Sequence, residues 1–418
     1  MSKFASVCRS TLVAVLGCAV MMLSSSTTSA QALAWSYSFD GTYGANPWTS
    51  PTLGGSTLYG TTQGGGAYGD GAIYSLPATG GTPTALCSFN MADGSTSDCH
   101  LTLVGNTLYG QAGFGGPGGF GTVFSLPTSG GTPNVLASFS YGSTNGWCPD
   151  GALTVIGSTI YGAASGDASA GITGTIFSIP TSGGPVTVLA SFNGANGSLP
   201  RGSLTQIGSA LYGTTGYGGP SNDGVIFSVP MSGGAPTVLA AFNGANGALP
   251  YNGASLTRVG STLYGATAEG GAYGGGTVFS VPLTGGPITD LCSFNGPNDG
   301  GPWGSLTLSP DGSTLYGMTM QGGLYGDGSI FSIPVSGGTP TTLFSFDGTN
   351  GQSPWSELTL SPDGSTLYGT TSGGGASGDG TAFALNLNPV PEPSTIVLLG
   401  IASVSVLAYA WRKRTRTA

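Results

Sequence analysis

The chain has 418 residues and carries little charge, with 8 lysines and arginines against 17 aspartates and glutamates. Six of the basic residues lie in the first nine or last seven positions, so residues 33–388 hold two cations, Arg201 and Arg258, and sixteen acidic residues, a net charge of −14. A body this acidic repels a phosphate backbone, which excludes nucleic acid as a partner. The 79 glycines and 27 prolines would indicate disorder if the sequence had no repeat.

Residues 1–32 have the pattern of a secretory signal peptide. Lys3 and Arg9 form a short basic start, an apolar run follows from 11 to 23, and Ala30-Gln31-Ala32 supplies a small-residue cleavage site. A Val-Leu-Gly-Cys stretch ending at Cys18 resembles a lipoprotein cleavage box, but the apolar run continues beyond it and favours the ordinary signal peptide. We expect the exported chain to begin near Leu33.

A Leu-Tyr-Gly motif (Ile-Tyr-Gly once) recurs seven times at a spacing of 50 to 52 residues. Its tyrosines are Tyr59, Tyr109, Tyr161, Tyr212, Tyr264, Tyr316 and Tyr368. A glycine-rich loop and a β-branched, aromatic run follow each copy, with the aromatic residue at Tyr74, Phe124, Phe177, Phe227, Phe279, Phe331 and Phe383. Seven repeats of this length, built from short strands and turns, predict an all-β fold, a seven-bladed β-propeller that forms one domain over residues 33–388.

Each repeat contains four predicted strands. In the sixth repeat they cover 306–309, 313–318, 329–334 and 341–346, and an Asp-Gly turn at Asp311 joins the first two into a hairpin. In a propeller, the loops from second to third strand share one rim with the loops that lead to the next blade. The glycine-rich loops and the inter-blade loops are therefore predicted to lie together.

The stretch 33–40 matches the strands that follow each Ser-Gly-Gly turn, whose shared aromatic residues are Phe89, Phe139, Phe192, Phe242, Phe294 and Phe346. Phe39 is the seventh member of this set, whereas the last repeat stops after its third strand, at 385–388. We infer that the N-terminal strand completes the seventh blade and closes the ring, which removes an unpaired edge.

The repeat pattern, as it stands at Leu263-Tyr264-Gly265, Gly270-Gly271 and Gly276-Thr277-Val278-Phe279, resembles the GloVer tandem-repeat family of bacterial surface proteins. The resemblance covers nearly the whole exported chain and implies repeats and a surface location, without implying an enzymatic activity. The third repeat departs from the pattern at 165–168, where the double glycine is missing.

The C-terminal end has three parts. A linker at 389–395 contains Pro391-Glu392-Pro393, an apolar run at 396–411 predicts a transmembrane helix of roughly 24 Å, and the basic tail at 412–418 is expected in the cytoplasm. This order resembles the PEP-CTERM sorting signal, which implies an exosortase-type processing enzyme as partner and delivery to the cell surface. The alternative is a plain single-pass anchor.

The exported chain contains Cys87, Cys99, Cys148 and Cys292. Export favours disulfides, but Cys87 and Cys292 hold the same place in the first and fifth blades and are too far apart around the ring to pair. A possible disulfide joins Cys99 and Cys148, which lie in successive inter-blade loops. The alternative is four unbridged thiols.

No catalytic set or cofactor site is predicted. His100 is the only histidine, so we interpret it as a surface loop residue, and no cluster has the spacing of zinc ligands. Asp98 and Asp150 occupy matching loop positions and are a candidate carboxylate pair of the glycosidase kind. The Gly-Asp-Gly turns offer only one carboxylate each, at Asp70, Asp327 and Asp379, which favours turn chemistry over calcium binding.

The residue after the proline of each inter-blade loop differs between blades: Trp48, Asp150, Arg201, Tyr251, Trp303 and Trp355. Trp48, Tyr251, Trp303 and Trp355 belong to contiguous blades, and we hypothesise that they form an aromatic arc for stacking against sugar rings. The alternative is that these rings wedge between blades as core. The favoured function is a binding module for extracellular polysaccharide or another surface partner; the alternatives are a structural coat or biofilm protein and a propeller enzyme acting on glycans.

Overall fold

The computed structural model describes residues 31–95, 100–166, 171, 173–250, 255–295 and 300–388. The chain divides into two units, Met1–Gln31 and Ala32–Ala418, and the fold lies in the second. Nearly all of the predicted signal peptide, and the whole chain from residue 389 with the sorting motif and the predicted transmembrane helix, lie outside the described residues. Within them, no helix is long and apolar enough to cross a membrane.

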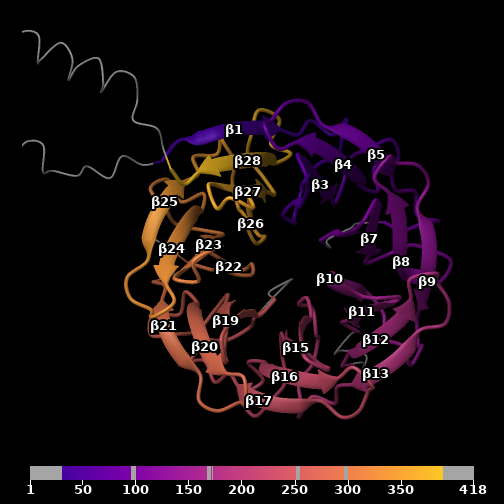
Figure 1. Cartoon of the computed structure of the whole chain (residues 1–418), viewed down its shortest axis with the longest axis vertical. Coiled ribbons are helices and arrows are strands. Elements are labelled where there is room, and N and C mark those ends of the chain that lie inside the picture. Colours follow the sequence, from indigo (N-terminus) through magenta and orange to yellow (C-terminus); the bar gives the residue numbers. More distant parts are fainter. Residues whose placement is uncertain are drawn as a thin grey trace, which may run out of the picture. The chain divides into compact units, whose positions relative to one another are not determined.

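The described residues form seven four-stranded antiparallel sheets arranged as the blades of a propeller, as predicted (Figure 1). Blades one to six take four consecutive strands each from β2 to β25, and blade seven combines β26–β28 with β1. The strands are β1 (Leu33–Ser38), β2 (Thr52–Gly54), β3 (Thr57–Thr62), β4 (Ala72–Pro77), β5 (Thr84–Ser88), β6 (Thr102–Val104), β7 (Thr107–Ala112), β8 (Gly119–Pro127), β9 (Asn134–Ser140), β10 (Pro149–Ile156), β11 (Thr159–Ala164), β12 (Thr175–Pro180), β13 (Thr187–Ser191), β14 (Thr205–Ile207), β15 (Ala210–Thr215), β16 (Val225–Pro230), β17 (Thr237–Ala241), β18 (Thr257–Val259), β19 (Thr262–Thr267), β20 (Thr277–Pro282), β21 (Thr289–Ser293), β22 (Thr307–Leu308), β23 (Thr314–Thr319), β24 (Ser329–Pro334), β25 (Thr341–Ser345), β26 (Thr359–Leu360), β27 (Thr366–Thr371) and β28 (Thr381–Asn386).

The N-terminal strand closes the ring. Strand β1 pairs antiparallel with β28, in a register that runs from Leu33 opposite Leu385 to Ser38 opposite Thr381. In Figure 1 the indigo β1 therefore lies beside the yellow β28, on the outer side of blade seven. This confirms the prediction that the first strand supplies what the last repeat lacks.

The strand boundaries of the sixth repeat agree with the prediction within about two residues. The Asp-Gly hairpin between β22 and β23 is also present, and there Asp311 accepts hydrogen bonds from the Ser309 hydroxyl and from the Ser313 N–H and hydroxyl. These bonds stabilise the carboxylate and lower the pKa of Asp311 to about 2. Asx-type turn chemistry, predicted from the Pro-Asp-Gly sequence, thus shapes this tight turn.

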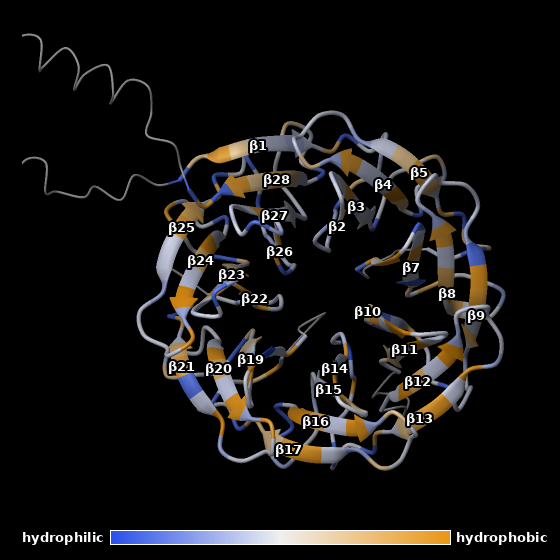
Figure 2. Ribbon diagram, viewed as in Figure 1, coloured by the Kyte–Doolittle hydropathy of each residue, from blue (hydrophilic) through white to orange (hydrophobic). Residues whose placement is uncertain are grey.

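Seven hydrophobic clusters form the core, each shared by two neighbouring blades. Figure 2 shows hydrophobic residues along the third strands, such as β8, β12 and β16. An aromatic pair with ring centroids 4.9–5.3 Å apart crosses every blade interface: Phe39 with Tyr74, Phe89 with Phe124, Phe139 with Phe177, Phe192 with Phe227, Phe242 with Phe279, Phe294 with Phe331 and Phe346 with Phe383. These pairs explain why both aromatic positions recur in every repeat.

The same pairs explain the glycine of the Leu-Tyr-Gly motif. Gly110 lies directly opposite Phe124 in the β7–β8 ladder, and a Cβ at Gly110 would stand 2.5 Å from the Phe124 Cζ atom. A side chain therefore cannot replace this hydrogen without moving the ring. The equivalent approach recurs in all seven blades, so the motif records a packing requirement.

A hydrogen bond also links each first strand to the next blade at the inner edge of the ring. In each case a threonine of the first strand donates its hydroxyl to a backbone carbonyl of the next blade. The accepting residue is the one directly before the equivalent threonine of that blade. At the six successive interfaces from blade one to blade seven, the pairs are Thr52 with Leu101, Thr102 with Leu153, Thr154 with Leu204, Thr205 with Leu256, Thr257 with Leu306 and Thr307 with Leu358. The repeated threonine thus holds neighbouring blades together near the axis.

Candidate ligand-binding rim

The two long loops of each repeat meet on one rim, as predicted. Isolated bridges join the inter-blade loop to the loop after the second strand of the same blade: Ala45 with Gly64, Ser95 with Phe114, Ser198 with Tyr217, Ala248 with Glu269 and Gln352 with Gly373. This loop-bearing surface, which we call the loop rim, carries the described candidate residues of the aromatic arc, Trp48, Trp303 and Trp355.

The backbone of the inter-blade loops is held in one unusual conformation. The residue before the proline has a positive φ of 48 to 71°: Asn46, Cys148, Leu199, Leu249, Gly301 and Ser353. Residues before proline normally prefer extended conformations, so the surrounding structure must enforce this one. The N–H of each of these residues donates to a carbonyl of the preceding blade, as from Asn46 to Asp379 at 2.8 Å.

The last glycine of the glycine-rich loop makes room for this proline. A Cβ at Gly121 would lie 2.5 Å from Cδ of Pro149, and Gly380 has the same relation to Pro47 at 2.7 Å. The loop backbones are therefore fixed by packing between blades. What varies from blade to blade is the side chain that each loop presents.

Two positions of the loop rim vary strongly although the core positions repeat. One is the residue after the proline, already described; the other is the residue before the double glycine, which is Gly64, Phe114, Tyr217, Glu269, Gln321 and Gly373 in six of the blades. Varied side chains on a repeated, rigid frame are typical of a recognition surface.

Three of the four predicted arc residues contact one another. The Trp48 and Trp355 rings are stacked, with centroids 4.9 Å apart and an interplanar angle of 9°, and Trp303 meets Trp355 edge to face at 4.6 Å. All three side chains are partly buried. We call them the tryptophan cluster. Tyr251 lies outside the described residues, so its place in the arc stays a prediction.

A small cavity of about 200 Å³ adjoins the cluster between blades five and six. Trp303 forms one wall, Glu269 and Gln321 supply polar groups, and the remainder is Met320, Ala268 and glycine backbone. Sequence reasoning missed Glu269 and Gln321. The sequence does contain a signal for these two residues, because both occupy the variable position before a double glycine.

His100 is not the surface residue that the sequence suggested. Its side chain is buried, and Nδ1 lies 3.5 Å from Oε1 of Glu357. His100 lies just before the first strand of blade two, and Glu357 lies just before the first strand of blade seven. The pair therefore connects the two blades that flank blade one, at the inner edge of the ring. Both residues stand two positions before the first-strand threonine of their blades. The sequence contains this match, but only the closed ring brings the two side chains together.

Asp150 and Arg201 occupy the same loop position in blades three and four. Burial raises the pKa of Asp150 to about 6, and the Arg201 charge and a hydrogen bond from the Gly151 N–H only partly offset this rise. Asp98 lies outside the described residues, so the carboxylate pair with Asp150 stays a prediction.

No group of three or more potential metal ligands occurs in the described part of the chain. At the Gly-Asp-Gly turn of blade one, Asp70 accepts a hydrogen bond of 3.2 Å from the Met91 N–H, in keeping with turn chemistry.

Cys87 and Cys292 lie on the matching strands of their blades, as the repeat register predicts. Cys87 is buried on β5, and Cys292 lies on β21, four blades further along the chain. Burial, with a contribution from Asp93, raises the pKa of the Cys87 thiol to about 12, which makes it unreactive. Cys99 lies outside the described residues, so its disulfide with Cys148 stays a prediction.

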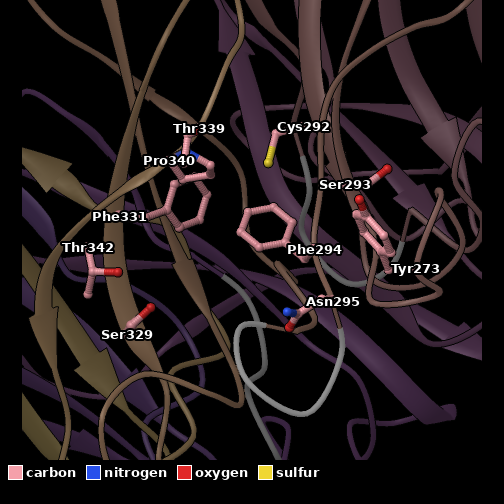
Figure 3. Close-up of a pocket in the computed structure, with 10 residues that line it drawn as sticks. All are labelled: Tyr273, Cys292, Ser293, Phe294, Asn295, Ser329, Phe331, Thr339, Pro340 and Thr342. Carbon is pink, nitrogen blue, oxygen red and sulfur yellow. The ribbon is translucent and has the colours of Figure 1, made fainter.

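A larger cavity of about 450 Å³ lies where the outer strand of blade five, together with Tyr273 of the glycine-rich loop of that blade, meets blade six (Figure 3). The rings of Phe294 and Phe331 line it together with several hydroxyl groups. Two of these hydroxyls are already used inside the blades: Ser293 bonds to Asp290 and to the Ala272 N–H, and Ser329 to Thr319. This cavity therefore has fewer polar groups to offer a ligand than its lining suggests.

Comparison with solved structures shows the fold alone. Oligogalacturonate lyase from Vibrio parahaemolyticus is 10% identical with a TM-score of 0.51, over 84% of this chain and 91% of the lyase. A 6-phosphogluconolactonase-like protein from Bacteroides uniformis is 16% identical with a TM-score of 0.45, over 75% and 88% of the two chains. TolB from Acinetobacter baumannii is 17% identical with a TM-score of 0.40, over 64% of this chain and only 60% of TolB. No curated protein matches the sequence.

Family models match the sequence along almost its whole length. The Gloeobacter/Verrucomicrobia repeat matches three times, at residues 17–220, 101–263 and 206–397, and the PEP-CTERM protein-sorting motif matches residues 389–414. These matches agree with the sevenfold repeat of the propeller and with the Pro-Glu-Pro segment that follows it. The chain therefore belongs to the Gloeobacter/Verrucomicrobia repeat family and ends in a PEP-CTERM protein-sorting motif.

Proposed function

We propose that this protein is a non-catalytic binding module that holds neutral polysaccharide on its loop rim after export. The sorting motif implies export and processing by an exosortase. The binding role is our inference from the loop rim, where rigid backbone presents side chains that differ between blades.

The observation that carries the proposal is Trp303, which joins the tryptophan cluster to the cavity beside it. Indole faces stack on the apolar faces of sugar rings, and polar groups at the margin bind the hydroxyls and set orientation. Glu269 and Gln321 also line this cavity; Glu269 supplies a hydrogen-bond acceptor, and Gln321 supplies both a donor and an acceptor. A cavity of about 200 Å³ has room for one sugar unit of a chain.

The charge of the site favours a neutral ligand. Glu269 lines the cavity and the body as a whole carries a net charge of −14, so a polyanionic chain would be repelled. Trp48 and Trp355 stack on each other and Trp303 meets Trp355 edge to face, so Trp48 retains at most one ring face for a ligand. The cluster therefore extends the contact area beyond the cavity without needing further sugar-specific groups.

Binding of dextran, mannan and a soluble β-glucan to the exported form, measured by affinity electrophoresis, tests the proposal. We expect at least one of them to bind. Trp303→Ala should weaken that binding at least tenfold, about 1.4 kcal/mol, whereas Trp303→Phe should retain most of it because an aromatic face remains.

Tyr325→Ala is the matched control, since Tyr325 is an aromatic residue of blade six that is 60% exposed and does not line the cavity. It should leave binding unchanged. Melting temperatures of all variants separate loss of binding from loss of fold. Unchanged binding by a well-folded Trp303→Ala variant, or no binding to any neutral polysaccharide, would favour a structural coat role instead.

Processing is tested separately, by mass spectrometry of the protein recovered from the surface of cells that contain an exosortase. We expect chains that end near Pro391-Glu392-Pro393. Recovery only of chains that retain the tail from Arg412 would reduce the motif to an ordinary membrane anchor.

A further inference from the structure

A second cavity of about 350 Å³ lies on the loop rim at the other side of the ring, where blades two, three and four meet. It is lined by Phe114, Phe120, Trp147, Cys148, Leu199 and Arg201, together with Gly166. None of these residues belongs to the tryptophan cluster or to the cavity beside Trp303, so this cavity is a separate feature of the rim.

Several departures from the repeat converge on this cavity. Phe120 stands where three other blades have the aspartate of Gly-Asp-Gly. Trp147 stands two residues before the loop proline, where blade one has Ala45, and Arg201 stands where blade one has Trp48. Because the frame of each blade is otherwise repeated, side chains that break the pattern in one place indicate a local requirement that packing alone does not impose.

The walls are aromatic and held rigidly. Phe120 and Trp147 have ring centroids 4.8 Å apart, and Tyr141 and Trp147 meet edge to face with centroids 5.0 Å apart. The backbone supports them, since the Cys148 N–H donates to the Phe120 carbonyl at 3.0 Å and the Gly166 N–H to the Trp147 carbonyl at 3.1 Å. Phe114 completes the apolar lining, although half of its surface is exposed.

Two of the residues that line this apolar space carry donor groups. Trp147 Nε1 is buried, and it has no hydrogen-bond partner among the described residues. Buried indole N–H groups nearly always find an acceptor, so this one calls for a bound acceptor. Arg201 is the other donor, and it is one of only two cations between residues 33 and 388. Arg258, the second, donates a hydrogen bond to the Gly260 carbonyl in the tight turn between β18 and β19.

We propose that this cavity binds a carboxylate carried on a six-membered ring, with Trp147 Nε1 and the Arg201 guanidinium donating to the carboxylate and the Phe114 and Phe120 faces packing against the ring. Arginine and indole N–H groups suit a planar, two-oxygen acceptor. Asp150 shares the charge of Arg201, so a single carboxylate fits this site better than a polyanion. The proposal does not depend on neutral polysaccharide binding at Trp303.

A ring-borne carboxylate has two natural sources, a uronic acid unit of a glycan and an aromatic acid. Calorimetric titration of the exported form with glucuronate and with benzoate covers both, and methyl glucoside and benzamide are the uncharged counterparts. We expect at least one acid to bind and its uncharged counterpart to bind at least tenfold more weakly. The acid that binds identifies the source.

Variants then test the named donors. Trp147→Phe removes the N–H but keeps an aromatic ring, and Arg201→Gln removes the charge; each should weaken acid binding at least fivefold. Arg258→Gln removes the other cation of the body at an exposed site and should change binding less than twofold. Arg201→Lys keeps the charge without the planar guanidinium and should give an intermediate affinity. This variant tests the role of Arg201 even if Arg201→Gln fails to fold.

Three outcomes would overturn the proposal. They are binding of neither acid, equal binding of the uncharged counterparts, and equal losses for Arg258→Gln and Arg201→Gln. Failure here is distinguishable from failure at the tryptophan cluster, because Trp303→Ala should leave acid binding unchanged.

Discussion

Thr359 Oγ1 donates a hydrogen bond of 2.6 Å to the carbonyl oxygen of Pro51, a residue 308 positions earlier in the chain. This is the seventh of the inner threonine bonds, and it crosses the seam between the last blade and the first. Ser50 and Ser356 add a hydroxyl pair at 2.9 Å across the same seam. The seam is therefore bonded at its inner edge as the other interfaces are, while β1 and β28 close blade seven at the outer edge.

A chain that begins at Gly41 should lose cooperativity. It lacks β1 and also Phe39, which is fully buried and packs on Tyr74 at the seam. Removal of a buried phenylalanine alone typically costs about 3–5 kcal/mol, and the exposed edge of β28 adds to this. Scanning calorimetry compared with a chain that begins at Leu33 should show a lower and broader transition. An equally sharp transition at the same temperature would refute closure by β1.

Tyr74→Phe should stabilise the protein. Tyr74 is the only tyrosine among the seven third-strand aromatic residues, and its hydroxyl is buried without a hydrogen-bond partner among the described residues. Removing an unsatisfied buried hydroxyl should gain about 1–3 kcal/mol in urea denaturation. The reciprocal change Phe124→Tyr, at the equivalent position of blade two, should lose a similar amount. Opposite signs for the two variants are required, and equal signs would contradict the packing described.

Gly110→Ala should destabilise the protein while Gly64→Ala should not. The new methyl group at Gly110 meets Phe124 Cζ at 2.5 Å, whereas a Cβ at Gly64 has no neighbour within 4 Å. Overpacking of this kind costs about 1–3 kcal/mol, and the control should stay within about 0.5 kcal/mol. Thermal unfolding of both variants measures the difference. Equal effects would mean that the motif glycine serves the backbone rather than the aromatic ring.

Asp150→Asn should stabilise the protein at pH 7.5 and have little effect below pH 4. The pKa of Asp150 is about 6 in the folded state against 3.8 for the unperturbed group, so the folded chain holds this proton more tightly than the unfolded chain. The contribution of Asp150 to stability is thus fully present below about pH 4 and is lost as the pH rises through about 6. The gain at pH 7.5 should be roughly 1–3 kcal/mol in urea denaturation. A gain that is the same at both pH values would exclude this titration.

The period and the strand alternation of the sequence were enough to predict the propeller and its closure, because Phe39 fits the outer-strand pattern that the last repeat leaves unfilled. They predicted equally well that Trp48, Trp303 and Trp355 lie on contiguous blades. The stacking of Trp48 on Trp355 could not be predicted, since it depends on the curvature of a closed ring.

Other features of the loops could not be predicted, because local sequence preferences indicate a different conformation or environment. Leu199 and Ser353 adopt a positive φ before proline, against the preference of that position, because neighbouring blades over-determine the loop. His100 looked like polar surface because its partner Glu357 is more than 250 residues away in the sequence. Trp147 could not be recognised from the repeat because the matching position, two residues before the loop proline, is a small residue in blade one, Ala45.

Amide hydrogen exchange of the exported form, with and without the neutral polysaccharide that binds best, tests the central claim that the loop rim is the binding face. Bound ligand should slow exchange in segments 268–275 and 300–304, around Trp303, and leave the tight turns at 181–184 and 336–338 on the opposite rim unchanged. Slowed exchange confined to those turns, or no change on the loop rim at saturating polysaccharide, would contradict the account.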